Sequence, residues 1–223
     1  MHLSLSPIET KMITVGGYLF WTLLYVLVIR RGLKDRTYGF PMVALCVNVS
    51  WEFLATFVYP LPNGGAVGNG IWLGFDLVIL YTLLRFGRDN LRAEISPRWF
   101  YPTVLLLLAL AFWLEWAFIA GMNDRFCMIS ASLNTMLLSI LFVAMILRRG
   151  NVLGQSFYIA LLMLLGDICG AGMIAIGAEE LNPPSSVILM YPIWVSILCA
   201  NVIYCVLVWR MTKAAGLNPW RRW

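Results

Sequence analysis

The chain has 223 residues, of which 61% are hydrophobic and only 12% are charged. Soluble domains carry roughly twice that fraction of charged residues, so the composition excludes an ordinary soluble domain. The net charge of +5 suggests nucleic-acid binding at first sight, but the positions of the basic residues point to membrane orientation instead, and we expect no nucleic-acid partner.

The apolar residues form seven stretches, each close to the roughly 20 residues that a helix needs to cross a bilayer. Turn-forming or charged segments separate these stretches. The sequence therefore predicts an all-α, polytopic membrane protein with one transmembrane domain, 1–223, built as a bundle of seven transmembrane helices. In chain order, the expected spans are about 12–29, 38–58, 69–86, 101–121, 126–147, 156–177 and 188–209.

The basic residues test this topology, because Lys and Arg collect on the cytoplasmic side of a membrane protein. With seven spans, 14 of the 16 Lys and Arg residues lie on one side, and the other side carries only Lys11 and Arg125, with the acidic Glu9, Asp124, Glu179 and Glu180. We therefore expect the N-terminus outside and the C-terminus in the cytoplasm. The membrane is expected to be the plasma membrane of a bacterium, or the endoplasmic reticulum of a eukaryote.

Four carboxylic acids lie within the expected spans, and no Lys, Arg or His lies in the interior of any span: Glu52, Asp76, Glu115 and Asp167. A charged acid at the centre of a membrane helix costs about 2.5–3.5 kcal/mol, so such residues usually face a cavity and have a function. Without a basic partner, burial favours the neutral form of these acids, which is able to donate a proton.

The depth of these acids, read from the direction of each span, places them in the central and outer layers of the membrane together with Asn134 and Asn201. Asn48 and Glu52 are four residues apart and share one helix face. These polar groups are therefore expected to line one cavity. The alternative is that amides such as Asn48 and Asn134 only bond one helix to another, at perhaps 1 kcal/mol or less each.

Aromatic residues are spread along the same spans. Most aromatic residues of membrane proteins are packing or interfacial residues. Rings that face an acidic cavity would suit a carbocation, because the face of an aromatic ring attracts positive charge. The candidates for such rings are Trp51, Trp72, Trp113, Trp116, Trp194 and Tyr204.

The sequence lacks several signatures of other chemistries. It has no lysine within a span for a retinal Schiff base, no Asp-rich motif for magnesium diphosphate and no histidine cluster for a metal. We therefore expect acid–base chemistry inside the membrane, with no metal and no cofactor.

Four stretches together resemble the small integral-membrane terpene cyclases of fungal meroterpenoid and indole-diterpene pathways and of bacterial drimentine-type indole sesquiterpenoid pathways. The segment Asn48-Val49-Ser50-Trp51-Glu52-Phe53, followed by Tyr59-Pro60, is similar to the second helix of that family. The other three stretches are Trp72-Leu73-Gly74-Phe75-Asp76, Gly154-Gln155-Ser156 and Asn201-Val202-Ile203-Tyr204. The resemblance spans most of the chain.

The resemblance implies a class II-type cyclase, in which an acid protonates the alkene or epoxide of a prenyl chain and the cation then closes rings. The prenyl group of the substrate would be a farnesyl group attached to an indole, a diketopiperazine or another aromatic group. An upstream prenyltransferase would supply this substrate. Glu52 matches the family's acid in the second helix. The family's second acid, in the seventh helix, corresponds to Asn201, so Asp167 or Asp76 is expected to take over part of its role.

These arguments give two sets of candidate residues. The candidate catalytic residues are Glu52, Asp76, Asp167 and Asn201, and the candidate substrate-binding residues are Asn48, Trp51, Trp72, Trp113, Glu115, Trp116, Asn134, Trp194 and Tyr204. Two other functions remain open: a small proton-coupled transporter that uses the same acids, and a noncatalytic assembly or receptor protein. No internal repeat is visible, which disfavours the transporter, and the acid and aromatic content disfavours the noncatalytic protein.

Overall fold

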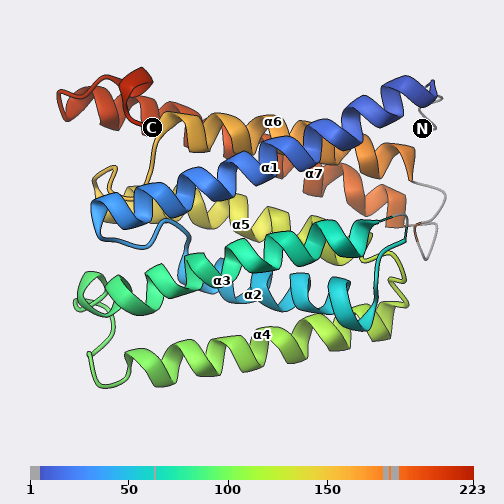
Figure 1. Ribbon diagram of the computed structural model, residues 1–223, viewed down its shortest axis with the longest axis horizontal. Coiled ribbons are helices and arrows are strands. Elements are labelled where there is room, and N and C mark those ends of the chain that lie inside the picture. The colour runs from blue at the N-terminus through green and yellow to red at the C-terminus, as the bar shows by residue number, and fades with distance from the viewer. Residues whose placement is uncertain (1–5, 63, 178–180, 182–185) are drawn as a thin grey trace.

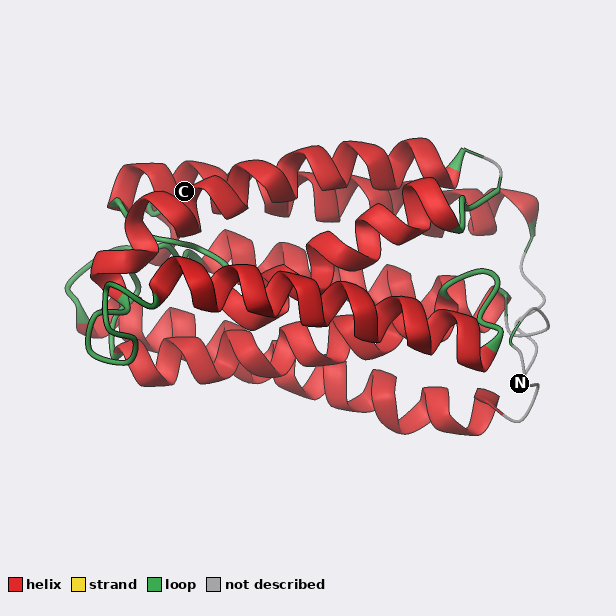
Figure 2. Cartoon of the chain, turned by 90° about the horizontal axis from the view of Figure 1, so that it is seen from below, coloured by secondary structure: helices red, strands yellow, loops and turns green. Residues whose placement is uncertain are grey.

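The computed structural model describes residues 6–62, 64–177, 181 and 186–223. This part of the chain is helical and contains no strand (Figure 2). The helices are α1 (Pro7–Asp35), α2 (Met42–Phe53), the π-helix η1 (Leu54–Val58), α3 (Gly65–Asn90), α4 (Phe100–Met122), α5 (Met128–Arg149), α6 (Phe157–Ile176), α7 (Ser186–Ala214) and the short 3-10 helix η3 (Pro219–Arg221). Glu179 and Glu180 lie outside the described residues.

Six of these helices, α1 and α3 to α7, are long and apolar enough to cross a membrane. The remaining apolar helix, Met42–Val58, is shorter and consists of α2 continued by η1. It begins at Met42 because Pro41, which has no N–H to donate to a preceding turn, stands at its N-cap. The chain is thus all-α and has the helices of a polytopic membrane protein.

The helices lie side by side as a bundle (Figure 1). Helix α1 packs against α6 and α3, α2 packs against α3, α4 and α5, and α7 packs against α5 and α6. Helix α4 lies at the edge of the bundle and packs mainly on α2. This arrangement places α2 and α3, which carry Glu52 and Asp76, in the interior of the bundle.

Small residues let α1 and α6 approach closely, as is common between membrane helices. A Cβ atom added to Gly16 would lie 3.2 Å from Sγ of Cys169, and one added to Gly166 would lie 2.8 Å from the Trp21 ring. Gly166, which precedes Asp167 in the chain, is thus a point of close approach between the two helices.

The loops after α1, α3 and α5 lie with the C-terminus at one end of the bundle (Figure 1). We call this end, formed by residues 30–41, 85–99, 148–156 and 210–223, the basic end. Asp35 ties it together by accepting hydrogen bonds from the Gly154 N–H and the Arg222 guanidinium, each at 2.8 Å, and by pairing with Arg31. These contacts join the end of α1 to the start of α6 and to the C-terminal tail.

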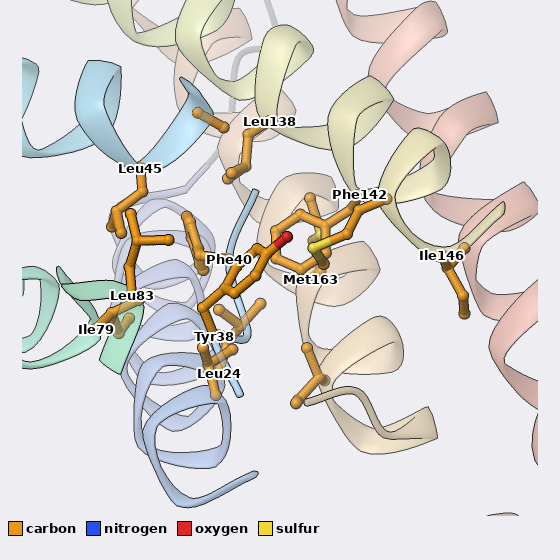
Figure 3. Close-up of a cluster of buried hydrophobic side chains, with 14 of the residues drawn as sticks. Leu24, Tyr38, Phe40, Leu45, Ile79, Leu83, Leu138, Phe142, Ile146 and Met163 are labelled. Atoms are coloured by element: carbon orange, nitrogen blue, oxygen red, sulfur yellow. The ribbon is translucent and has the colours of Figure 1, made fainter. Parts of the chain in front are cut away.

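The basic half of the bundle also holds the largest cluster of buried apolar side chains (Figure 3). These side chains come from all seven α-helices that the structure describes and from loops such as the one before α2. Those labelled in the figure are Leu24, Tyr38, Phe40, Leu45, Ile79, Leu83, Leu138, Phe142, Ile146 and Met163. Because this half is packed with apolar groups, the buried acids form a separate polar layer beyond it.

Candidate active site

Asn48 on α2 is the hub of a buried polar network that joins four helices. Its Nδ2 group donates to the Tyr25 hydroxyl on α1 at 2.7 Å and to Oδ2 of Asp76 on α3 at 2.6 Å. Its Oδ1 accepts a hydrogen bond from Nδ2 of Asn134 on α5 at 2.8 Å. Because both donors and the acceptor of the amide are engaged, Asn48 fixes the orientation of Asp76.

Glu52 lies one helical turn beyond Asn48, and its side chain is only 2% exposed. Asp76, which is completely buried, lies close enough for the two carboxyl groups to interact electrostatically. Oε2 of Glu52 and Oδ1 of Asp76 have no hydrogen-bond partner among the described residues. Unpaired buried polar atoms are rare in native structures and need a functional or structural explanation.

More unpaired atoms belong to the helices around this pair. They are Oγ1 of Thr56, Nδ2 of Asn69 and Oδ1 of Asn134, all buried and without a partner in the described chain. Thr56 follows Glu52 by one turn, and Asn69 precedes Asp76 by two turns, so they extend the same faces of α2 and α3. Together with the two acids, they provide donors and acceptors that a polar part of a bound molecule can use.

Among the described residues, no basic side chain acts electrostatically on either acid. The charged group that acts on Glu52 is Asp76, and Asn48 supplies the hydrogen bond that Asp76 accepts. Two neighbouring carboxylates in a buried site repel each other, so the pair is most stable when it holds at least one proton. The arrangement thus has the chemistry of a proton donor.

Aromatic rings lie on the α1 and α3 side of this pair. The Tyr18 and Trp72 rings are stacked with their centroids 4.9 Å apart, and the Trp72 indole N–H donates to Oγ1 of Thr22 at 3.1 Å. Behind them the Tyr25 ring lies 6.1 Å from Phe75 and 6.4 Å from Trp72. Ring faces at these positions are able to stabilise a cation that forms near the acids.

Asp167 and Asn201 form a second buried pair, on α6 and α7. Nδ2 of Asn201 donates to Oδ2 of Asp167 at 2.7 Å, and Trp21 lies against the same carboxyl group. Oδ1 of Asn201 has no partner in the described chain. The centroid of the Trp21 ring is also 6.1 Å from that of the Tyr25 ring. These two aromatic residues of α1 therefore lie between the two acidic sites. The single acidic cavity expected from depth alone is divided into two sites.

Trp51, Ser130 and Asp124 form a hydrogen-bonded chain at the start of α5. The Trp51 indole N–H donates to Oγ of Ser130 at 3.1 Å, and Ser130 donates to Oδ2 of Asp124 at 2.9 Å. Asp124 also accepts from the backbone N–H groups of residues 128–130. Asp124 lies in the loop between α4 and α5, where it is buried and accepts hydrogen bonds at the start of α5, so this chain has a structural role.

The remaining candidates lie apart from the Glu52–Asp76 pair. Glu115 is half-buried on α4 and interacts electrostatically with Asp124. Trp194 packs its ring over Gly170 near the second pair. Tyr204 is fully buried and donates to Oε1 of Gln155, whose Nε2 donates to the Gly39 carbonyl at 2.7 Å. Gln155 and Tyr204, which belong to two of the stretches that resemble the family, thus hold the basic end together.

Trp113 and Trp116 are not brought to the polar core. They are 64% and 45% exposed on α4 at the edge of the bundle. We expect Trp113→Leu to keep wild-type activity within about twofold, because surface substitutions away from structural features usually change stability by less than about 0.5 kcal/mol. Activity in membranes, normalised to protein content, measures this. A loss beyond tenfold would place Trp113 in contact with the substrate.

Sequence reasoning missed Tyr18, Trp21 and Tyr25 on α1. Their spacing contains the signal, because residues three, four and seven positions apart share a helix face. Thr22, which bonds Trp72, lies on the same face.

Comparison with known proteins identifies the family. The sequence profile of the Pyr4-like transmembrane terpene cyclases matches residues 3–214. The chain belongs to this family. The sequence-based resemblance to small membrane terpene cyclases is thereby confirmed, and the protein is a membrane enzyme of terpene cyclisation rather than a transporter or a noncatalytic protein.

Three similar proteins carry names that agree with the family. The Pyr4-family terpene cyclase mfmH of Annulohypoxylon moriforme is 29% identical over 75% of this chain and 76% of its own. Terpene cyclase macJ of Penicillium terrestre is 28% identical over 70% of this chain and 62% of its own. Terpene cyclase pyr4 of Aspergillus fumigatus is 27% identical over 86% of this chain and 83% of its own. No solved structure matches the chain. The likeness to bacterial drimentine-type cyclases stays a prediction.

The Glu52–Asp76 pair of this Pyr4-like cyclase is buried. Two cavities, of about 240 and 170 Å³, lie at the basic end, and neither acid lines them. No group of three His, Cys, Asp or Glu side chains able to hold a metal gathers in the described ranges.

Proposed function

We propose that this Pyr4-like cyclase starts cyclisation by protonating an alkene of a prenyl chain, with the Glu52–Asp76 pair as the acid. The substrate is a farnesyl chain on an indole, a diketopiperazine or another aromatic group, supplied by a prenyltransferase. The buried pair of acids with unpaired oxygens, oriented by Asn48, is the observation that supports this proposal. The protein crosses the membrane seven times with its C-terminus in the cytoplasm, in a bacterial plasma membrane or the endoplasmic reticulum.

In this mechanism the pair holds one proton at the start of the reaction. Asn48 donates to Oδ2 of Asp76, so the proton is carried either by Oδ1 of Asp76 or by the Glu52 carboxyl group. Transfer of this proton to an alkene carbon leaves a tertiary carbocation, whose attack by the next double bond forms a ring. Loss of a proton from carbon to the carboxylate ends the reaction, so the product is an isomer of the substrate and the acid is restored. No metal or cofactor takes part.

The stacked Tyr18 and Trp72 rings give the prenyl chain a path to the acids. Both rings are only half-buried and lie between α1 and α3, where a hydrocarbon chain arrives from the bilayer. Outward rotation of the two rings opens the site, and the chain then replaces them beside Tyr25. The closed site excludes water, which would otherwise quench the cation.

The test is cyclisation in deuterium oxide. Membranes that contain the protein are incubated with farnesyl-indole or farnesyl-quinol compounds, and products are compared in H₂O and D₂O by mass spectrometry. Alkene protonation predicts a cyclic isomer that gains one non-exchangeable deuterium per molecule in D₂O. An excess of EDTA is expected to leave the rate unchanged. A product without carbon-bound deuterium, or a reaction stopped by EDTA and restored by Mg²⁺, would contradict the mechanism.

Asp167 is expected to take over part of the role of the acid that the family carries at the position of Asn201. Asp167→Asn keeps an acceptor for Nδ2 of Asn201 but is unable to give or take a proton. We expect it to lower the rate about 10²-fold, the lower range for a lost acid–base group, with the melting temperature unchanged. Turnover per folded protein and thermal unfolding in detergent measure the two quantities. Full activity of Asp167→Asn would show that Asp167 takes no part in proton transfer and would leave Glu52 and Asp76 as the acids of the reaction.

A further inference from the structure

A polar cavity of about 240 Å³ opens at the basic end, away from the acids. It lies between the loop after α1, the end of α3 and the end of α5. Its lining residues are Thr37, Tyr38, Asn90, Glu94, Arg148, Arg149, Asn151 and Leu153. Two arginines and one carboxylate give this cavity a net positive charge.

The two arginines are held in place but retain free donors. Arg149 donates to the Tyr38 carbonyl at 3.0 Å and to the Leu153 carbonyl at 3.1 Å, and its guanidinium lies 4.0 Å over the Tyr38 ring. Arg148 donates to the Tyr38 hydroxyl at 3.1 Å. Each guanidinium carries five N–H donors, so these three bonds leave most donors of the pair for an anion.

Glu94 neutralises Arg148 only weakly. Its Oε1 atom lies 3.6 Å from Nη1 of Arg148, beyond hydrogen-bond distance, and the two side chains are 39% and 48% exposed. An ion pair with this exposure contributes on the order of 0–1 kcal/mol. A phosphate, which accepts two parallel N–H bonds from a guanidinium, competes well with such a partner.

A second cavity, of about 170 Å³, shares Tyr38 and Arg148 with the first. Its other lining residues are apolar: Pro41, Met42, Val43, Leu91, Leu141, Ala144 and Met145. Val43 and Ala144 are exposed on the outside of the bundle, so this groove faces the hydrocarbon side of the membrane. A cationic compartment therefore continues into an apolar groove.

We propose that these two cavities form a binding site for one anionic phospholipid. The phosphate lies against Arg148 and Arg149, and an acyl chain occupies the groove beside Met42 and Met145. Basic pockets between membrane helices bind anionic lipid head groups in this way. The apolar groove favours a lipid over free phosphate, because it provides burial for a chain that inorganic phosphate lacks. This site is independent of the cyclisation mechanism.

The test is lipid titration of the delipidated, full-length protein in detergent, followed by native mass spectrometry. The probes are phosphatidylglycerol, phosphatidylcholine and inorganic phosphate. We expect one phosphatidylglycerol to bind at least about tenfold more tightly than phosphatidylcholine, because both lipids carry a phosphodiester but the choline ammonium of phosphatidylcholine is repelled by the two arginines. Inorganic phosphate is expected to neither bind nor compete at equal concentration.

Four variants locate the site. Arg148→Gln is expected to weaken phosphatidylglycerol binding about tenfold. Glu94→Gln is expected to strengthen it, a result that misfolding is unable to mimic. Ala144→Trp fills the groove and is expected to abolish binding of the lipid. Arg98→Gln removes a charge from an exposed residue of the same end that lines neither cavity, and is expected to leave binding unchanged.

Three results would overturn the assignment. Equal affinity for phosphatidylglycerol and phosphatidylcholine would remove the role of the arginines. If Arg98→Gln and Arg148→Gln weaken phosphatidylglycerol binding equally, the lipid is attracted by the overall positive charge of the basic end and not by this site. Competition by inorganic phosphate, with wild-type affinity in Ala144→Trp, would show an anion site that holds no lipid.

Discussion

Glu52→Gln is expected to abolish cyclisation, with the rate falling by about 10³- to 10⁴-fold, the upper range for removal of a general acid. The side chains have nearly the same shape, so packing between α2 and α3 is kept. The glutamine amide has no acidic proton to give to an alkene, and the initial cation does not form. Conversion of prenylated indole or quinol substrates by membranes, normalised to folded protein, measures the effect.

Glu115→Gln is the matched control. Glu115 is a half-buried acid on α4 that interacts with Asp124 and lies outside the Asn48 network. We expect this variant to keep its activity, because the lost charge is remote from the aromatic rings beside Glu52. Unchanged conversion in Glu52→Gln would remove Glu52 from the mechanism, and equal losses in both variants would indicate a general effect of charge on folding.

Asn48→Leu is expected to affect both stability and activity. The substitution removes the amide that joins Tyr25, Asp76 and Asn134, and it leaves their polar atoms buried without a partner. Each unpaired buried group costs about 1–3 kcal/mol in soluble proteins, and average bonds between membrane helices contribute about 0.6 kcal/mol. We expect a loss of about 1–3 kcal/mol in the free energy of unfolding, together with loss of turnover, because Asp76 is no longer oriented.

Ser50→Ala provides the comparison for Asn48→Leu. Ser50 is buried on the same helix, but its hydroxyl bonds only the Cys46 carbonyl of its own helix at 2.8 Å. Its removal is expected to leave unfolding in detergent nearly unchanged. If Asn48→Leu unfolds like the wild type and turns over substrate at the same rate, the Asn48 network neither stabilises the protein nor orients Asp76 for the reaction.

Hydropathy was sufficient to predict the helical class because membrane helices must be long and apolar. The position of Glu52 near Asp76 was also within reach, since both acids were expected in overlapping layers of neighbouring spans. Family membership then confirmed the terpene cyclase resemblance, which composition alone would not have reached.

The sequence did not indicate which face of each helix points into the bundle. Helix α4 is apolar on all sides, so no periodicity shows that Trp113 and Trp116 face outward. The order of helices in the bundle was equally hidden. Helix α1 lies between the two acidic pairs, and its aromatic residues therefore divide an acidic region that depth alone predicted as one cavity.

The packing of α1 on α6 has a consequence for biogenesis. A ribosome makes about 5–20 residues per second, so α1 enters the membrane on the order of ten seconds before α6 is complete. During this interval, Gly16 and Gly17 of α1 face lipid or a helper protein, because their contacts, Cys169 and Met173, do not yet exist. Insertion of the first helix and its final docking are thus separate events, and the Asp167–Asn201 pair beside α1 is assembled only when translation is nearly finished.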